Sequence, residues 1–193
     1  MRLVKAGAGS PYLEMIERTN LEAFPPEEQL PVAVQADMCS RGELDLWALC
    51  KGNSYCGFTS VYKGDRSVYV FFLAVDSSCR ASGCGTQALQ LIRETYPGKQ
   101  VVLDIEPLDP YAENAAQRVR RKGFYLRNAF RESGWLFKYC GMSFEVLWSG
   151  GTSFDKDAYW SLVQDIALSV EAQGYKGFNP SLEKLSDEPE AID

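Results

Sequence analysis

The order of the predicted elements indicates an α+β fold, with a mixed, mostly antiparallel central sheet of about six to seven strands flanked by helices. Three segments rich in Val, Tyr, Phe and Trp lie at residues 44–50, 55–63 and 67–75. The turn-forming sequences KGNS and KGDR separate them, and this spacing predicts an antiparallel meander. Beyond residue 75, helical and strand-like patterns alternate, which predicts helices packed against the sheet.

A short strand and two helices are predicted before the meander. Residues 2–5 form a strand-like segment that ends at AGAGS. Apolar residues at helical spacing follow Pro11, and Pro25 and Pro26 end this helix because proline breaks the backbone hydrogen-bond pattern. A second helix follows Pro31 and ends near Gly42.

The elements after the meander alternate between helix and strand. A helix follows the loop at residues 79–85 and ends at Pro97, and residues 100–106 form a strand. Asp109 and Pro110 predict the start of the next helix, because aspartate caps a helix N-terminus and proline suits the first helical position. Two strands at 135–141 and 143–148 close the sheet, and a C-terminal helix spans residues 155–173.

The composition predicts a soluble, cytoplasmic protein. Hydrophobic residues make up 46% of the chain and charged residues 24%, which is usual for globular domains. No apolar stretch approaches the roughly 20 residues that span a bilayer, and the start MRLVKAG lacks the apolar segment of a signal peptide. The net charge of −6 argues against a nucleic-acid partner, because phosphate binding needs clustered Lys and Arg.

The cysteine and histidine content restricts the chemistry. The six cysteines form no C-x-x-C pair and the chain has no histidine, so we expect no metal site and no imidazole catalysis. Free, mostly buried thiols are expected in a chain of this length without a secretion signal. Cys79 and Cys84 flank a loop, and a redox pair between them is the alternative.

The loop at residues 79–85, CRASGCG, lies between the last strand of the meander and a predicted helix. The N–H groups of a first helical turn bind phosphate where glycine lets the backbone come close, and Arg80 adds forked donors. The alternative is a turn that uses glycine only for its conformation. A P-loop is excluded because no lysine follows Gly85. A dinucleotide-binding loop stays open, since Gly83, Gly85 and Ala88 match its pattern and Asp104 follows about 20 residues later.

Two segments together resemble the GNAT N-acetyltransferase superfamily. LAVDSSCRASGCGTQAL is similar to its core motif, Arg/Gln-x-x-Gly-x-Gly/Ala between a strand and a helix. RVRRKGFYLRNAF is similar to its later motif Tyr-x-x-x-Gly-Phe, with Ala129 where glycine is usual. The arginines before Phe124 and Tyr125, and AFPPEEQLP at 23–31, resemble one bacterial subgroup. The resemblance covers most of residues 1–148.

The resemblance implies a domain organisation, a co-substrate and a set of site residues. A GNAT domain would span residues 1–150, with a helical extension at 151–175 and a flexible acidic tail at 176–193. Acetyl-CoA would be the co-substrate, bound by the segments Leu73, Ala74, Val75 and Arg80, Ala81, Ser82, Gly83, Cys84, Gly85, Thr86. Tyr125 would be the general acid, because its phenol is protonated at neutral pH.

The base that takes the proton of the attacking ammonium has to be a carboxylate or water, since histidine is absent. Glu106, at the end of a strand, is the first candidate for the base. Glu27 and Glu28, in the loop between the first two helices, are the alternatives, and they are also candidate substrate-binding residues. The expected acceptor is a small-molecule or peptide amine, and the protein a monomer or homodimer. The alternatives are a non-catalytic acyl-CoA-binding module and an NAD(P)-dependent oxidoreductase.

Overall fold

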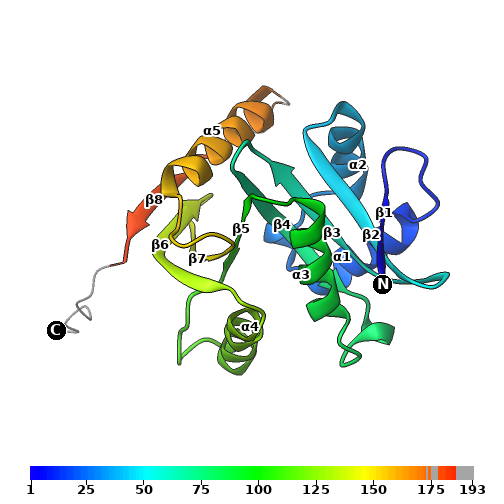
Figure 1. Ribbon diagram of the computed structural model, residues 1–193, viewed down its shortest axis with the longest axis horizontal. Coiled ribbons are helices and arrows are strands. Elements are labelled where there is room, and N and C mark those ends of the chain that lie inside the picture. Colours follow the sequence, from blue (N-terminus) through cyan, green and yellow to red (C-terminus); the bar gives the residue numbers. More distant parts are fainter. Residues whose placement is uncertain (173, 175–177, 186–193) are drawn as a thin grey trace.

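The computed structural model describes residues 1–172, 174 and 178–185, with the chain arranged around one sheet (Figure 1). Five helices and eight strands follow one another along these residues. In chain order they are β1 (Arg2–Lys5), α1 (Leu13–Ala23), α2 (Val32–Arg41), β2 (Leu44–Lys51), β3 (Ser54–Lys63), β4 (Ser67–Val75), α3 (Cys84–Thr95), β5 (Gln100–Ile105), α4 (Ala115–Arg127), β6 (Arg131–Tyr139), β7 (Met142–Ser149), α5 (Lys156–Ala172) and β8 (Ser181–Lys184).

The strand order is β1-β2-β3-β4-β5-β7-β6-β8, and the sheet is mostly antiparallel as predicted. The meander is confirmed, because β2, β3 and β4 pair antiparallel in sequence. Within this sheet β4 and β5 are the parallel pair. The dinucleotide-binding interpretation therefore fails, since that fold needs a parallel sheet built from strand-helix-strand units.

The pair β4 and β5 separates along its length. Cα pairing extends only from Ser67 opposite Gln100 to Tyr69 opposite Val102, although β4 continues to Val75 and β5 to Ile105. Backbone groups past the last pair are therefore available to other partners, and side chains can enter the gap between the strands. The candidate site lies in this gap.

Two hydrophobic clusters cover the two faces of the sheet. The larger includes Ile16 of α1, Met38 of α2 and Val163 of α5. The smaller includes Leu89 and Ile92 of α3 and is bordered by Phe124 and Tyr125 of α4. Thus α1, α2 and α5 pack on one face and α3 and α4 on the other.

The described part of the predicted tail differs from the expectation. Ser181–Lys184 form β8, an edge strand that pairs antiparallel with β6, so the sheet has one strand more than the upper expectation. Leu182 packs against the larger cluster and Glu183 forms an ion pair with Lys138, at 2.5 Å between Oε2 and Nζ. The rest of the expected tail, residues 176–177 and 186–193, lies outside the described residues.

The start of α4 is also corrected. The sequence predicted Asp109 as the N-cap, and Asp109 does accept a hydrogen bond from the Tyr111 amide at 2.9 Å. That turn does not continue as a helix, and α4 begins after Asn114. The physical reason is a second attachment: Asn114 Nδ2 donates to both oxygens of Glu106, at 3.0 and 3.3 Å, which sets the position where the chain enters α4.

Candidate active site

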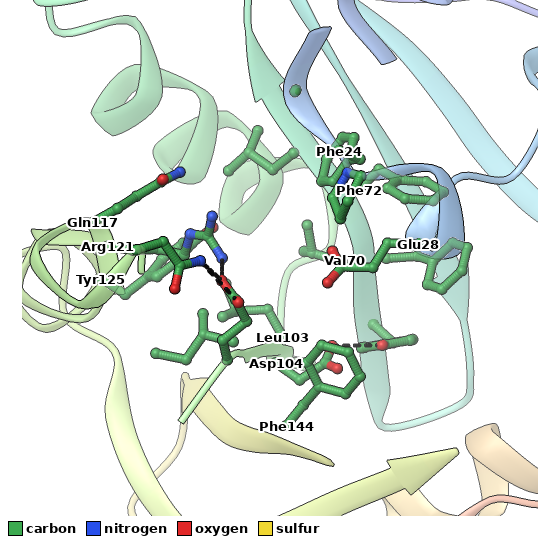
Figure 2. A pocket seen from close by; sticks show the side chains of 18 of the residues that line it. Phe24, Glu28, Val70, Phe72, Leu103, Asp104, Gln117, Arg121, Tyr125 and Phe144 are labelled. Atoms are coloured by element: carbon green, nitrogen blue, oxygen red, sulfur yellow. Dashed lines mark hydrogen bonds and ion pairs between the residues drawn. The ribbon is translucent and has the colours of Figure 1, made fainter. Parts of the chain in front are cut away.

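A pocket of about 330 Å³ fills the gap between the diverging strands β4 and β5. Residues 69–73 of β4 form one wall, and residues 103–105 of β5 with Glu106 just after it form another. Tyr125 of α4 closes a third side, and Phe24 and Glu28 reach in from the segment between α1 and α2 (Figure 2). We call this the reaction pocket.

Asp104 is the carboxylate on the floor of the reaction pocket. Its Oδ1 accepts a hydrogen bond from the Tyr69 hydroxyl at 2.5 Å, which uses one of its several acceptor positions. Burial raises the pKa of Asp104 to about 7, and the nearby charge of Glu28 acts in the same direction. A carboxyl group with this pKa exchanges a proton readily at neutral pH.

Glu106, the first candidate for the base, lies in the wall of the same pocket but in a different environment. Its two oxygens form ion pairs with Arg118 at 3.0 Å and Arg121 at 2.8 Å, in addition to the hydrogen bonds from Asn114. Two guanidinium groups and an amide compete for its lone pairs. The geometry therefore favours a positioning role for Glu106, which fastens α4 to the end of β5.

Tyr125 lies at the C-terminal end of α4, and the way this helix ends fixes its position. The Phe130 amide donates to the Tyr125 carbonyl at 3.1 Å and the Ala129 amide to the Leu126 carbonyl at 3.3 Å. Together with the ring contact of Tyr125 and Phe130, at 5.6 Å between centroids, this is a Schellman motif. Ala129 occupies the left-handed position with φ 64°, which explains why glycine suits this position.

The hydroxyl of Tyr125 stays protonated over the neutral range. Burial raises the pKa of this phenol to about 12, and the nearby charge of Arg121 opposes the rise. A phenol with this pKa carries its proton at neutral pH, so it is present as a hydrogen-bond and proton donor and not as a base.

A second pocket, of about 400 Å³, lies beside the reaction pocket and is lined by the loop between β4 and α3. Leu73 and Tyr125 line both pockets, so the two adjoin. All the predicted cofactor-binding residues line this second pocket except Ala74, which is buried in the larger cluster, and Ser82, whose exposed side chain donates to the Cys79 carbonyl at 2.5 Å. We call this pocket the cradle.

The backbone of the cradle has the shape of an anion-binding loop. Ala81 and Gly83 both have left-handed backbones, with φ 60° and 75°, and α3 begins directly after Gly83 without a side-chain cap. No side chain caps the amides of the first turn of α3, so these N–H groups are available for a phosphate. These donors fit the pyrophosphate of coenzyme A.

Gly85 has a different reason to be glycine. A Cβ atom at this position would lie 2.9 Å from the Phe124 ring, so α4 packs directly on the first turn of α3. At Gly83 a Cβ would meet nothing within 4 Å, and the left-handed φ is the constraint there.

The predicted substrate-binding glutamates differ in what can be said of them. Glu28 lines the reaction pocket, and Figure 2 shows its carboxylate pointing into it from the side opposite Tyr125. The side chain of Glu27 lies outside the described part of the structure. The six cysteines are all free, with four buried, as expected. Cys79 is half-buried and its Sγ contacts the Tyr55 carbonyl at 3.8 Å.

Sequence reasoning missed the role of Asp104 and its partner Tyr69. The sequence indicates Asp104 only as the acidic residue of a dinucleotide site and Tyr69 only as part of a strand. No local sequence pattern links Asp104 and Tyr69, because they lie on different strands and meet only in the fold, where β4 and β5 separate. Arg118 and Arg121 were visible as part of an arginine-rich helix, but their attachment to Glu106 was not.

Comparisons with known proteins agree with this arrangement. A family model described as acetyltransferase (GNAT) family matches residues 12–124. Among curated proteins, none matches the chain at a significant level.

Solved structures share the fold. One, described as a GNAT-family acetyltransferase from Bacteroides thetaiotaomicron, is 23% identical, covers 91% of this chain and 100% of its own, and has a TM-score of 0.70. An aminoglycoside 6'-N-acetyltransferase complexed with coenzyme A is 15% identical, with coverages of 77% and 96% and a TM-score of 0.60. A ribosomal-protein-alanine N-acetyltransferase from Brucella melitensis is 15% identical, with coverages of 77% and 99% and a TM-score of 0.56.

Proposed function

This chain belongs to the acetyltransferase (GNAT) family, and from that membership we propose that it transfers the acetyl group of acetyl-CoA to a primary amine of a small molecule or peptide while both substrates are bound. The observation that carries the proposal is that the cradle and the reaction pocket meet at Leu73 and Tyr125, which line both. It joins a set of phosphate-binding amides to a proton donor and a carboxylate. The proposed catalytic domain spans residues 1–150, and α5 extends it.

The cradle holds the pyrophosphate through the first-turn amides of α3 and through Arg80. Asp76 keeps this loop in place: its Oδ1 accepts from the Ser78 amide at 3.0 Å, and its Oδ2 pairs with Arg18 at 3.1 Å. The Arg80 Nε donates to the Val75 carbonyl at 3.4 Å, which leaves other guanidinium donors available.

The free edge of β4 is suited to the pantetheine arm. Asp76 donates its amide to the Cys56 carbonyl of β3 at 3.0 Å, so by alternation the backbone groups of Leu73 and Val75 face away from β3. Among the described residues β5 does not pair with β4 at this level. An amide-containing chain can therefore add to this edge as an extra strand.

Acetyl-CoA supplies the acetyl group, whose bond to sulfur breaks as a bond to the amine nitrogen forms. Asp104 accepts one proton of the ammonium, which frees the nitrogen lone pair for attack, because its pKa of about 7 leaves about half of the carboxyl group ionised at pH 7. The nitrogen releases its second proton to solvent once it carries the acetyl group. Tyr125 donates its proton to the departing thiolate and is reprotonated from solvent. Glu106, held by Arg118 and Arg121, keeps α4 and hence Tyr125 at the gap.

The substitution Tyr125→Phe tests this assignment. It removes one hydroxyl, and we expect a roughly 10- to 100-fold lower turnover, since a thiolate leaving group needs only moderate acid catalysis. The affinity for acetyl-CoA, measured by isothermal titration calorimetry, should stay within about twofold because the cradle is intact. Turnover is followed as thiol release over a panel of primary amines.

Tyr111→Phe is the matched control, since Tyr111 is 91% exposed and lines neither pocket. It should leave both quantities unchanged. Unchanged turnover in Tyr125→Phe at saturating amine would contradict the general-acid role. Binding of acetyl-CoA without turnover of any amine would instead support a non-catalytic acyl-CoA-binding module.

A further inference from the structure

The reaction pocket continues into a third cavity on the side away from the cradle. This cavity measures about 150 Å³, and Glu28, Tyr69, Phe71 and Tyr139 line both it and the reaction pocket. The cradle shares none of these residues. A molecule that enters the reaction pocket opposite the cofactor can therefore extend into the third cavity, which we call the apolar cavity.

The walls of the apolar cavity are almost entirely hydrocarbon and aromatic. The lining includes Val34 and Met38 from α2, Phe137 from β6, and Ile166 and Val170 from α5, together with residues of β3, β4 and β7. The hydroxyls of two lining tyrosines are already bound, since Tyr69 donates to Asp104 at 2.5 Å and Tyr62 to Met38 Sδ at 3.8 Å. Such walls favour an apolar group and offer little to a sugar or a second charge.

The volume of the apolar cavity sets the size of its occupant. A dry cavity of about 150 Å³ lined by aliphatic and aromatic side chains is known to hold a benzene molecule. One six-membered ring or a short branched alkyl group therefore fits, whereas a polycyclic group does not. Edge-to-face contacts with Tyr69 and Phe71, whose rings lie 5.9 Å apart, favour an aromatic ring.

Negative charge lies where the apolar cavity meets the reaction pocket. The Glu28 carboxylate points into the reaction pocket, and Asp104 lies on the pocket floor with its pKa raised partly by the charge of Glu28 (Figure 2). Two carboxylates that feel each other's charge attract a cation between them. An ammonium group placed there lies within reach of Asp104, and its substituent points toward the apolar cavity.

We propose that the acceptor is a primary amine joined by a short alkyl linker to one aromatic ring, with the ammonium between Glu28 and Asp104 and the ring in the apolar cavity. This inference rests on the proposed acetyl transfer and specifies its acceptor. The ammonium loses one proton to Asp104, and the nitrogen gains the acetyl group and releases a second proton to solvent, so the product is a neutral amide. The lost charge weakens the attraction to the carboxylates and promotes product release.

The first experiment compares 2-phenylethylamine with ethylamine as acceptors for the wild-type protein. Both present the same ammonium, and only the first carries a ring. We expect kcat/KM to be about 10- to 100-fold higher for 2-phenylethylamine, the gain from burying one phenyl group. Equal values for the two amines, with acetyl transfer observed, would overturn the acceptor inference and leave the proposed function standing.

The second experiment fills the cavity from two independent helices. Val34 of α2 and Val170 of α5 are both half-buried lining residues, so Val34→Phe and Val170→Phe can extend into the cavity without replacing a fully buried side chain. Each should abolish most of the preference for 2-phenylethylamine, measured as the ratio of its kcat/KM to that of ethylamine. The control is Leu168→Phe, on the same helix as Val170 but 66% exposed and outside the cavity.

Direct binding separates the failure of this inference from the failure of the proposed function. Calorimetry with 2-phenylethylamine should show binding to the wild-type protein, much weaker binding of the neutral 2-phenylethanol, and loss of binding in Val34→Phe. That pattern without acetyl transfer would reject the proposed function and retain the cavity assignment. Absence of both amine binding and amine turnover would overturn the inference. It would also be overturned if Val34→Phe selectively impaired the use of hexanoyl-CoA as the acyl donor, because an acyl chain would then occupy the cavity.

Discussion

Asp104→Asn removes the proposed base and keeps the shape of the side chain. The amide oxygen can still accept the hydrogen bond from the Tyr69 hydroxyl, so the floor of the reaction pocket is preserved. General bases contribute roughly 10²- to 10⁴-fold to turnover, and we expect kcat/KM for the amine to fall by that amount at pH 8. The pH dependence is the sharper readout.

The ratio of wild-type to variant kcat/KM isolates Asp104, because titration of the amine affects both proteins equally. With a pKa of about 7, Asp104 is active as the carboxylate, so the ratio should rise about tenfold per pH unit below 7 and level off above it. Glu106→Gln is the control because it retains Asp104, so the ratio of wild-type to Glu106→Gln kcat/KM should not change slope near pH 7. A ratio for Asp104→Asn that is flat with pH would refute the base assignment.

Stability gives an independent check of the same group. The pKa of Asp104 is higher in the folded protein than in the unfolded chain, so the folded state binds its proton more tightly and the free energy of unfolding falls as pH rises from about 4 to about 7. A rise from 3.8 to about 7 corresponds to at most about 4 kcal/mol. Urea unfolding should therefore show Asp104→Asn gaining stability relative to wild type between pH 5 and pH 8. An equal difference at both pH values would mean that Asp104 does not titrate in this range.

Three further changes test how the site is held in place. Ala129→Gly removes the strain of an alanine in the left-handed conformation and, after the cost of a more flexible unfolded chain, should stabilise the protein by about 0.5–1 kcal/mol, or a few degrees in thermal melts. The control Ala167→Gly, inside α5, should destabilise it by about 1 kcal/mol. A destabilised Ala129→Gly variant would contradict the Schellman assignment. Gly85→Ala places a Cβ against Phe124 and should weaken acetyl-CoA binding in calorimetry by roughly tenfold. The double variant Gly85→Ala/Phe124→Leu should recover the affinity. An affinity of Gly85→Ala equal to that of wild type would contradict the packing argument. Tyr69→Phe removes a hydrogen bond that stabilises ionised Asp104, so the bend in the pH profile should move above pH 7, and a bend that stays in place would show that this bond does not tune the base.

The sequence predicts the elements whose signals are local. The meander of β2, β3 and β4 is visible because β-branched and aromatic residues alternate between Gly-containing turns, and α1 ends where Pro25 forbids its continuation. The strand β8 could not be predicted in this way, because its four residues lie in an acidic segment and form a strand only by pairing with β6. Tertiary pairing overrides local preference there.

Likewise, only part of the candidate site can be predicted from the sequence. The cradle is predictable because its function needs consecutive backbone amides, which one short motif supplies. The proposed assignment of the base to Asp104 instead of Glu106 is not predictable, since it depends on which carboxylate meets two arginines and which faces the gap between β4 and β5. A carboxylate at the end of a strand has the same sequence signature in either case, and only its neighbours decide whether it holds a helix or takes a proton.

The three cavities also separate the parts of the chain that act on each substrate. Residues of α3 line the cradle and residues of α5 line the apolar cavity, whereas neither helix lines the reaction pocket between them. The reaction pocket is built from β4, β5 and α4 and from the segment that carries Glu28. Under the proposed acceptor assignment, α5 lines the acceptor end alone, so we expect changes in its cavity-lining residues to alter which amine is accepted without disturbing the first-turn amides of α3 or Tyr125. This arrangement lets a shared catalytic core serve different acceptors through an element that the core motifs do not include.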